Sequence, residues 1–311
     1  MRDGITHLRF LAAPGDLSAG SGTVPAGRIL EWIDRAGYAC AVGWSARYCV
    51  TAYVGDITFR STIRPGNLVE LRATLLYTGR TSMHIRVEVH ASRPEDPNPV
   101  PSASCLLVLI AKDDQGQSVP VPAWVPRNVK ELELADAAQT RIAPRRGIQE
   151  AMLKHSYRGG DPTNSAELRF LAAPGDANWD GRVHGGIAMR WMMEAGYACA
   201  TSWCAGRAIA VYSGGVQFIR PIEIGQVVEV SARLILTTAR SMHVGIRVHA
   251  ANATSPTALA LCTQAVTVFV QLGPDGKSRH VREFVPHTPA DEELIEHASD
   301  LMIMRRSLAP I

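Results

Sequence analysis

The chain consists of two copies of a related sequence, and this duplication limits its fold more than any other feature. The nine residues Leu8–Asp16 recur without change as Leu168–Asp176. The match continues downstream, where Ala36–Ala41 corresponds to Ala195–Ala200. A period of about 160 residues is too long for a solenoid repeat, so each copy is expected to form a whole domain with its own core.

The length and composition agree with two globular domains. The 311 residues are 46% hydrophobic and 20% charged, which is typical of a folded globular protein and not of a disordered one. We expect a first domain over residues 1–150 and a second over residues 168–311. Turn-forming residues in the stretch 151–167 indicate a linker between them.

Each copy has a long apolar segment followed by segments of alternating polarity. Residues 24–46 and 183–205 are apolar on nearly every side, which predicts a helix buried on most faces. The period then changes to two, which predicts antiparallel strands with one buried face, at 69–75 and 83–89 and again at 228–234 and 242–248. Each copy ends in a polar amphipathic segment that predicts a surface helix, at 129–142 and 291–304. The fold class is therefore α+β, with an antiparallel sheet wrapped around one long central helix in each copy.

Charge, hydropathy and cysteine content exclude several functions. The formal net charge is +3 without a basic block, which argues against nucleic acid as a partner. No apolar run is long enough to span a membrane. Asp3 and Pro14 interrupt the region that a signal peptide would need, so we expect a cytoplasmic protein. The six cysteines form no C-x-x-C pair, so we expect neither disulfides nor a metal site.

The two copies differ in chemistry around the predicted helix. The loop before the second helix carries Asn178, and the first copy has no amide there. The second helix begins with Gly185 and Gly186, whose backbone N–H groups have no acceptor within the helix and are favoured sites for developing negative charge. The first helix carries Asp34 where the second has Met193. Each copy keeps what the other has lost, which predicts one working site assembled from both halves.

Simpler interpretations of these residues stay open at this point. Asp34 is also compatible with a solvated stripe in which Glu31 and Arg35 form a helical ion pair. Asn178 is also compatible with a plain turn residue, and a lone histidine such as His184 is more often structural than catalytic. The simplest interpretation of two further histidines on the polar strand face is that they lie at the surface, at His84 and His243.

The residues around the second helix resemble the motif of acyl-CoA thioesterases of the hotdog fold. The resemblance rests on Leu168–Asp176, Asn178, Gly181, Val183–Gly186, Met189–Met192 and Glu194–Ala200. The first copy resembles the same motif with an altered loop and an intact Trp32–Gly37. The resemblance covers both copies and implies two tandem hotdog domains, that is, a double hotdog.

The resemblance also implies the composition of the site. In this family two hotdog units pair along their helices, and the site takes an Asn and a helix-start glycine from one unit and an Asp from its neighbour. Carried over, the set is Asn178 and Gly185 with Asp34. The mirrored site departs from the pattern at three positions, Met193, Ala26 and Ser18. One active site per chain is therefore expected.

The implied reaction is hydrolysis of acyl-CoA to a free acid and CoA. The N–H groups of Gly185 and Gly186 would stabilise the oxyanion, and Asn178 would orient the water or the carbonyl. Asp34 would act as general base or as nucleophile, and the sequence does not separate these roles. No cofactor is expected, because CoA is part of the substrate. Its phosphates are assigned to residues of the turn before the Ser-Met-His strand in each copy, Arg80, Arg240 and Ser241.

Two other functions remain as alternatives. One is a protein that binds acyl thioesters without cleaving them. The other is a hotdog hydratase or dehydratase, for which His184 with Asp180 is the nearest candidate pair. The resemblance further implies a homo-oligomer, by analogy a trimer of double hotdogs.

Overall fold

The structure is a computed structural model that describes residues 4–17, 22–159, 161, 163–306 and 308. It divides into two compact units, Met1–Ala143 and Pro144–Leu308, which we call the first and the second unit. The boundary thus falls a few residues before the predicted end of the first domain at residue 150. Each unit is described by itself.

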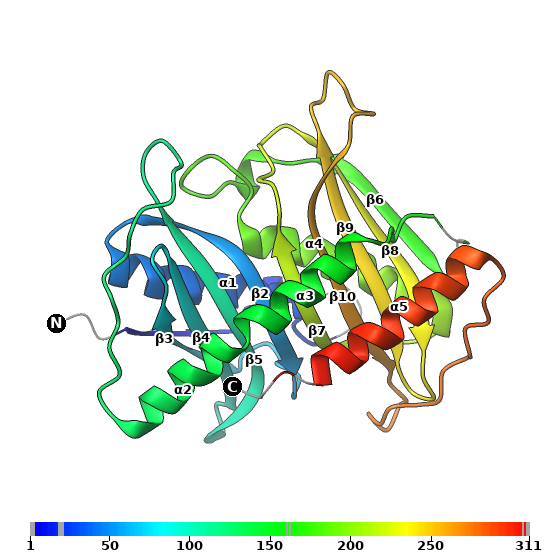
Figure 1. Ribbon diagram of the computed structural model, residues 1–311. Helices are drawn as coiled ribbons and strands as arrows, with labels where there is room; N and C mark the ends of the chain where they lie inside the picture. The colour runs from blue at the N-terminus through cyan, green and yellow to red at the C-terminus, as the bar shows by residue number, and fades with distance from the viewer. Residues whose placement is uncertain (1–3, 18–21, 160, 162, 307, 309–311) are drawn as a thin grey trace. The chain divides into compact units, whose positions relative to one another are not determined.

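The first unit is a five-stranded antiparallel sheet in the order β1-β3-β4-β5-β2, with one long helix and one shorter helix (Figure 1). Its elements in chain order are β1 (Ile5–Leu11), the 3-10 turn η1 (Pro14–Asp16), α1 (Ala26–Ser45), β2 (Tyr48–Phe59), β3 (Leu68–Thr78), β4 (Ser82–Arg93), β5 (Asp96–Lys112) and α2 (Val129–Thr140).

The second unit repeats this plan in the order β6-β8-β9-β10-β7. Its elements are α3 (Ile142–Leu153), β6 (Ser165–Leu171), the 3-10 turn η2 (Pro174–Asp176), α4 (Gly185–Cys204), β7 (Ala208–Phe218), β8 (Val227–Thr237), β9 (Met242–Ala251), β10 (Ala260–Gln271) and α5 (Pro289–Arg306). The structure confirms the predicted α+β class and both long helices.

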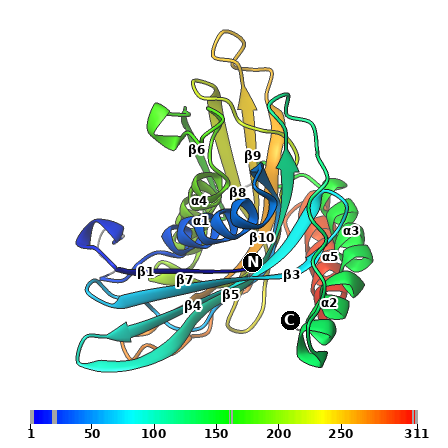
Figure 2. The same ribbon diagram turned by 90° about the vertical axis from the view of Figure 1, so that its left-hand side faces the viewer.

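Helix α1 forms the centre of the first unit because its side chains are apolar on most faces. Pro25 stands just before its first turn, where a missing N–H costs nothing, and Ala46 ends it in the left-handed conformation with a φ of 53°. Between them the helix packs on the sheet closely enough that a Cβ at Gly37 would lie 3.0 Å from the Leu107 side chain. On the other face of the sheet, Ala138 of α2 packs against Leu76 and Leu106, so the sheet separates α1 from α2 (Figure 2).

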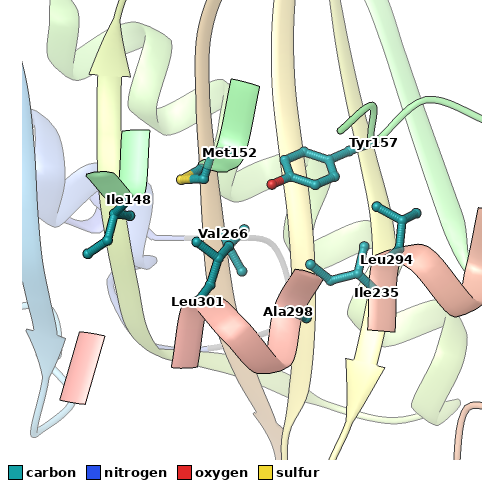
Figure 3. Packing of buried hydrophobic residues seen from close by; sticks show 8 residues of the cluster. All are labelled: Ile148, Met152, Tyr157, Ile235, Val266, Leu294, Ala298 and Leu301. Carbon is teal, nitrogen blue, oxygen red and sulfur yellow. The ribbon is translucent and has the colours of Figure 1, made fainter. Parts of the chain in front are cut away.

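The second unit has an additional helix on the outer face of its sheet, the face away from α4. Residues of α3 and α5 pack there on β8 and β10 (Figure 3). The cluster comprises Ile148, Met152, Tyr157, Ile235, Val266, Leu294, Ala298 and Leu301. Because these helices cover the polar side of the strands, β9 is buried along its whole length, whereas the sequence predicted strands with one solvated face.

Three features of the fold differ from the predictions. A strand, β1 or β6, precedes each long helix, because the repeated motif begins as an edge strand. A second helix, α3, follows α2 almost directly, and Pro144 is tolerated because it lies in the first turn. The stretch predicted as a linker contains Tyr157, which is fully buried in the second unit.

Candidate active site

Asp34 lies on α1 with its carboxylate against the sheet of the first unit. It is 1% exposed, and the Thr51 hydroxyl on β2 donates a hydrogen bond of 2.6 Å to its Oδ1. The carboxylate also acts on the thiol of Cys105 on β5. Burial raises the pKa of this thiol, and the negative charge of Asp34 raises it further. A buried carboxylate is costly unless it is paired or functional, so this geometry marks a specific role.

The alternative of a solvated helix stripe is wrong. Glu31 is also 1% exposed, and its partner is Arg28, not the predicted Arg35. Arg28 in addition pairs with Asp16 at 2.7 Å, which ties the first turn of α1 to the preceding 3-10 turn. The charged residues of α1 therefore do not form a surface stripe.

The second unit lacks both members of the Asp34–Thr51 pair. The helices align at Met193, which is buried. Strand register identifies the other position, because Thr51 pairs with Leu109 and Leu109 with Met83. In the second unit Met242, the counterpart of Met83, pairs with Phe269 on β10, and Phe269 pairs with Ala210 on β7, so Ala210 has the place of Thr51. The sequence also aligns Thr51 with Ala210, because the copies keep one constant offset from Ala36 to Met83, but a lone threonine in a strand gives no sign that its hydroxyl meets a helix carboxylate.

Asn178 holds together the loop that precedes α4. Its side-chain oxygen accepts hydrogen bonds from the backbone N–H of Asp180 at 2.9 Å and of Arg182 at 3.1 Å. Its own backbone N–H donates to the Arg182 carbonyl, and Gly181 supplies the positive φ that this turn needs. The Asn178 oxygen is therefore a structural acceptor, and its amide nitrogen is the part suited to donate to a substrate.

The first turn of α4 contains a helix cap that involves Gly186. The Gly186 N–H donates to His184 Nδ1 at 3.2 Å, so His184 caps the helix. The single hydrogen of the Gly186 backbone N–H therefore has an acceptor within the loop. Gly185 is the first residue of the helix, where N–H groups lack an intrahelical acceptor, and the assignment of both glycines as oxyanion donors stays a prediction.

Ser241 lies in the turn between β8 and β9 and takes part in local hydrogen bonds. Its hydroxyl lies 2.7 Å from the Thr238 hydroxyl and 3.3 Å from His243 Nε2. His243 itself is buried, as is its counterpart His84, so the prediction that both lie at the surface is wrong.

Arg240 lies at the carboxyl end of α4. The carbonyl of its neighbour Ala239 accepts from the Val281 N–H, and the carbonyl of Arg282, the residue after Val281, accepts from the Trp203 indole in the last turn of the helix. A helix of this length spans about 30 Å, so within the second unit Arg240 is far from Gly185.

Arg80 has the equivalent place in the first unit. The Val121 N–H donates to its carbonyl at 3.0 Å, and the Trp44 indole at the end of α1 donates to the Pro122 carbonyl at 2.8 Å. The contacts within each unit thus place both arginines beside the carboxyl end of the long helix.

In the part of the chain that the structure describes, no group of three or more His, Cys, Asp or Glu side chains is arranged to hold a metal ion. No helix there is long and apolar enough to cross a membrane.

Comparison with known proteins decides the family. The model of the thioesterase superfamily matches residues 21–97 and 180–256, once in each unit. The acyl-CoA thioester hydrolase YciA of Salmonella typhimurium is 33% identical over 120 residues, which cover 38% of this chain and 90% of that protein. This chain belongs to the thioesterase superfamily.

More distant members of the superfamily match over a longer stretch. Acetyl-coenzyme A thioesterase of Mus musculus is 26% identical over 246 residues, 74% of this chain, and the matched part is 44% of that protein's length. Among solved structures, a putative oleoyl thioesterase from Lactobacillus plantarum aligns with a TM-score of 0.60 over 86% of this chain and 97% of its own. At 9% identity this likeness concerns the fold alone. The expectation of two tandem hotdog domains is thereby confirmed.

Proposed function

We propose that this protein hydrolyses acyl-CoA to a free acid and CoA at one composite site per chain, with Asp34 from the first unit and Asn178 and Gly185 from the second. The observation that carries the proposal is the reciprocal loss between the units. The first unit keeps a buried carboxylate with its hydroxyl partner, and the second keeps the amide loop and the glycine helix start. The similarity to an acetyl-coenzyme A thioesterase and to an acyl-CoA thioester hydrolase supports the substrate class.

Asp34 supplies the base or the nucleophile. The hydrogen bond from Thr51 holds Oδ1 in place, so the carboxylate has one orientation toward the reacting carbon. As a base it takes a proton from water, the hydroxide attacks the thioester carbon, and CoA thiolate leaves. As a nucleophile its oxygen attacks the same carbon, CoA thiolate leaves, and water hydrolyses the mixed anhydride. A single turnover in ¹⁸O-water identifies the second route when water attacks the Asp34 carbonyl of the anhydride, because the label then enters the Asp34 side chain.

Asn178 and Gly185 stabilise the charge that develops on the thioester oxygen. The Asn178 side-chain oxygen is fixed by two backbone N–H groups, which orients the amide nitrogen for donation. The Gly185 N–H stands at the positive end of the α4 dipole. Gly186 contributes by lacking a side chain, which leaves the helix start open to the substrate.

The remaining site assignments stay predictions. Arg80, Arg240 and Ser241 are assigned to the CoA phosphates, and the acyl chain is placed between helix and sheet. A homo-oligomer, by analogy a trimer of double hotdogs, and a cytoplasmic location also stay predictions. No cofactor enters the proposed reaction, since CoA arrives as part of the substrate.

Of the alternatives, the hydratase is less well supported by the local geometry. His184 caps α4, and Asp180 forms an ion pair with Arg182 at 3.1 Å, so both side chains serve the loop that they belong to. A non-hydrolytic binding protein would need no buried carboxylate beside the thioester.

A panel of saturated and 2,3-unsaturated acyl-CoA esters with thiol detection tests the proposal. Wild type should release CoA thiol from saturated esters, and the Asp34→Asn variant should not. Binding without release would support a sensor or scaffold, and consumption of the double bond without thiol release would support a hydratase.

A further inference from the structure

Trp179 is the most exposed large hydrophobic side chain in the part of the chain that the structure describes. It is 86% exposed and directly follows Asn178. Burial of a large apolar side chain normally stabilises a protein, so an indole held in water forgoes this gain in the free chain and can recover it when a ligand covers it.

The loop that carries Trp179 is held firmly. Asn178 accepts two backbone hydrogen bonds, and the Arg182 side chain joins Asp180 and Glu223, each at 3.1 Å. Backbone pairing of Ala177 with Val183 closes the base of the loop. The exposure of the indole is therefore a property of an ordered turn, and a side chain presented in this way loses little entropy on binding.

The tryptophan occurs only in the copy whose loop keeps the amide. The loop of the second copy, which retains the amide, has an aromatic residue next to it. The loop of the first copy reads Leu17–Gly22 and contains neither an amide nor an aromatic residue, although its residues 18–21 lie outside the described part. The indole is thus present in the copy that keeps the oxyanion side of the proposed site.

We infer that Trp179 binds the pantetheine arm of the acyl-CoA thioester. The inference rests on the proposed function, in which Asn178 and Gly185 meet the thioester carbonyl. The Cα atoms of Asn178 and Trp179 are neighbours, about 3.8 Å apart across one peptide bond, so the indole reaches groups a few bonds from the thioester.

The arm fits the indole better than the other parts of the substrate. In the proposed function the acyl chain enters the apolar space between helix and sheet, away from water, whereas the indole is exposed on the loop. The adenine is separated from the thioester by the whole arm and lies beyond the reach of this side chain. The dimethyl carbon of the arm packs on an aromatic face, and its amide carbonyls accept from the indole N–H.

The test compares Trp179→Ala and Trp179→Phe with the wild-type chain. KM and kcat are measured for a short, a medium and a long saturated acyl-CoA, and for the same acyl groups as ethanethiol esters, which lack the arm. Binding of CoA alone is measured by calorimetry, because it does not depend on turnover. Ile303→Ala is the matched control, since Ile303 is also an exposed apolar side chain, at 66%, and lies on α5, on the outer face of the sheet.

The inference predicts that Trp179→Ala raises KM about tenfold for all three CoA esters and weakens CoA binding by a similar factor. The kcat stays within about twofold, the ethanethiol esters are unaffected, and Trp179→Phe retains most of the affinity. Unchanged KM and unchanged CoA binding would overturn it. So would a KM effect that grows with chain length, which assigns the indole to the acyl chain, or a changed oligomer with unchanged kinetics, which assigns it to a contact between copies.

Failure of the proposed function gives a different result. In that case the wild-type chain hydrolyses none of the esters, whatever residue stands at 179. The calorimetric comparison then still decides whether the indole contacts CoA.

Discussion

Helices α1 and α4 have the same length, occupy the same place in their units and share a run of six residues, yet they differ at the buried position of Asp34. Asp34 of α1 receives a hydrogen bond from Thr51, whereas Met193 of α4 is aligned with it and Ala210 stands where a hydroxyl would be needed. The acid and its donor are thus both absent from the second unit. This joint absence supports the proposal that each chain uses one carboxylate site.

The outer faces of the two sheets differ for another reason. Glu88 of β4 is half-exposed, whereas Arg247 at the same register position of β9 is buried. The Arg247 guanidinium donates to the carbonyls of Met152 and His155 at the end of α3, where the helix dipole favours a cation. The difference shows that the additional helix, and not the strand sequence alone, determines burial.

The largest expected effect concerns Asp34. Asp34→Asn or Asp34→Ala should lower kcat/KM by about 10²–10⁴-fold, because the base or nucleophile is lost. Met193→Ala, or Met193→Leu with nearly the same volume, should leave kcat/KM close to wild type. Comparable losses of kcat/KM at both positions in steady-state assays would contradict the claim that only the first helix supplies a catalytic group.

Asn178 should show the next largest effect. Asn178→Ala should lower kcat/KM by about 10²–10³-fold through loss of an oxyanion donor. Asn178→Asp is the sharper variant, since the carboxylate still accepts from the loop N–H groups but cannot donate. Ser18→Ala, at a position outside the described residues, should remain near wild type. An active Asn178→Asp enzyme would show that only the loop structure matters.

Acid should destabilise the second unit through its buried histidines. Burial lowers the pKa of His243 and of His297 to about 4, and a nearby group lowers each further, Arg305 for His243 and chiefly His155 for His297. The unfolded chain binds these protons near pH 6.5, so stability falls as the pH drops from 6.5 toward 4, by up to roughly 3 kcal/mol for each histidine. Denaturant titrations at pH 7 and pH 4.5 measure the loss.

The matched variant for this prediction is His297→Gln, which removes one titrating group and keeps an acceptor for the Tyr157 hydroxyl that lies 2.7 Å away. The first unit has Ala137 at the corresponding place of α2. A stability profile of His297→Gln with the same pH dependence as wild type would contradict the assignment.

Thr51 should have a moderate effect on catalysis. Thr51→Val removes the 2.6 Å hydrogen bond to Asp34 and should lower kcat/KM by about 10–100-fold, the range for a hydrogen bond to a charged group. The acidic limb of the pH–rate profile should move to higher pH, since the hydroxyl favours the charged carboxylate. Thr51→Ser should restore both. An unchanged pH profile would reduce Thr51 to a packing residue.

The smallest expected effect is a difference in stability between alanine variants at equivalent glycines of the two helices, Gly196 and Gly37. A Cβ at Gly196 would lie 2.8 Å from Ile246 Cδ1 and 2.9 Å from Phe269 Cζ, while the nearest contact at Gly37 is 3.0 Å. Gly196→Ala should destabilise by about 1–3 kcal/mol. Gly37→Ala should be close to neutral, since alanine favours the helix by up to about 1 kcal/mol. Chemical denaturation measures both, and equal losses would contradict this ranking.

The fold could be predicted from the sequence because its signals are local and occur twice. The duplication defined the units, and the change from an apolar helix to alternating strands predicted the sheet and helix. What could not be predicted depends on tertiary packing. The burial of His243 and Tyr157 follows from α3 and α5, whose contacts with the sheet leave no periodic signal in the strands.

The candidate site was predictable where a difference between the copies also changes the chemistry of a recognisable motif. Asp34 and Asn178 stand out in this way, whereas the difference between Thr51 and Ala210 lies in a strand and shows its meaning only through the hydrogen bond to Asp34. The involvement of the Gly186 N–H with His184 depends on a side-chain conformation that the order of residues does not specify.

The central claim is that a carboxylate of the first unit and an amide of the second act on the same thioester. A crystal structure of the Asp34→Asn chain with a bound acyl-CoA tests it most directly. The account predicts that the side chains of residues 34 and 178 both lie within about 3–4 Å of the thioester group or of one water beside it. A thioester that contacts one of them while the other faces a different cavity would contradict it.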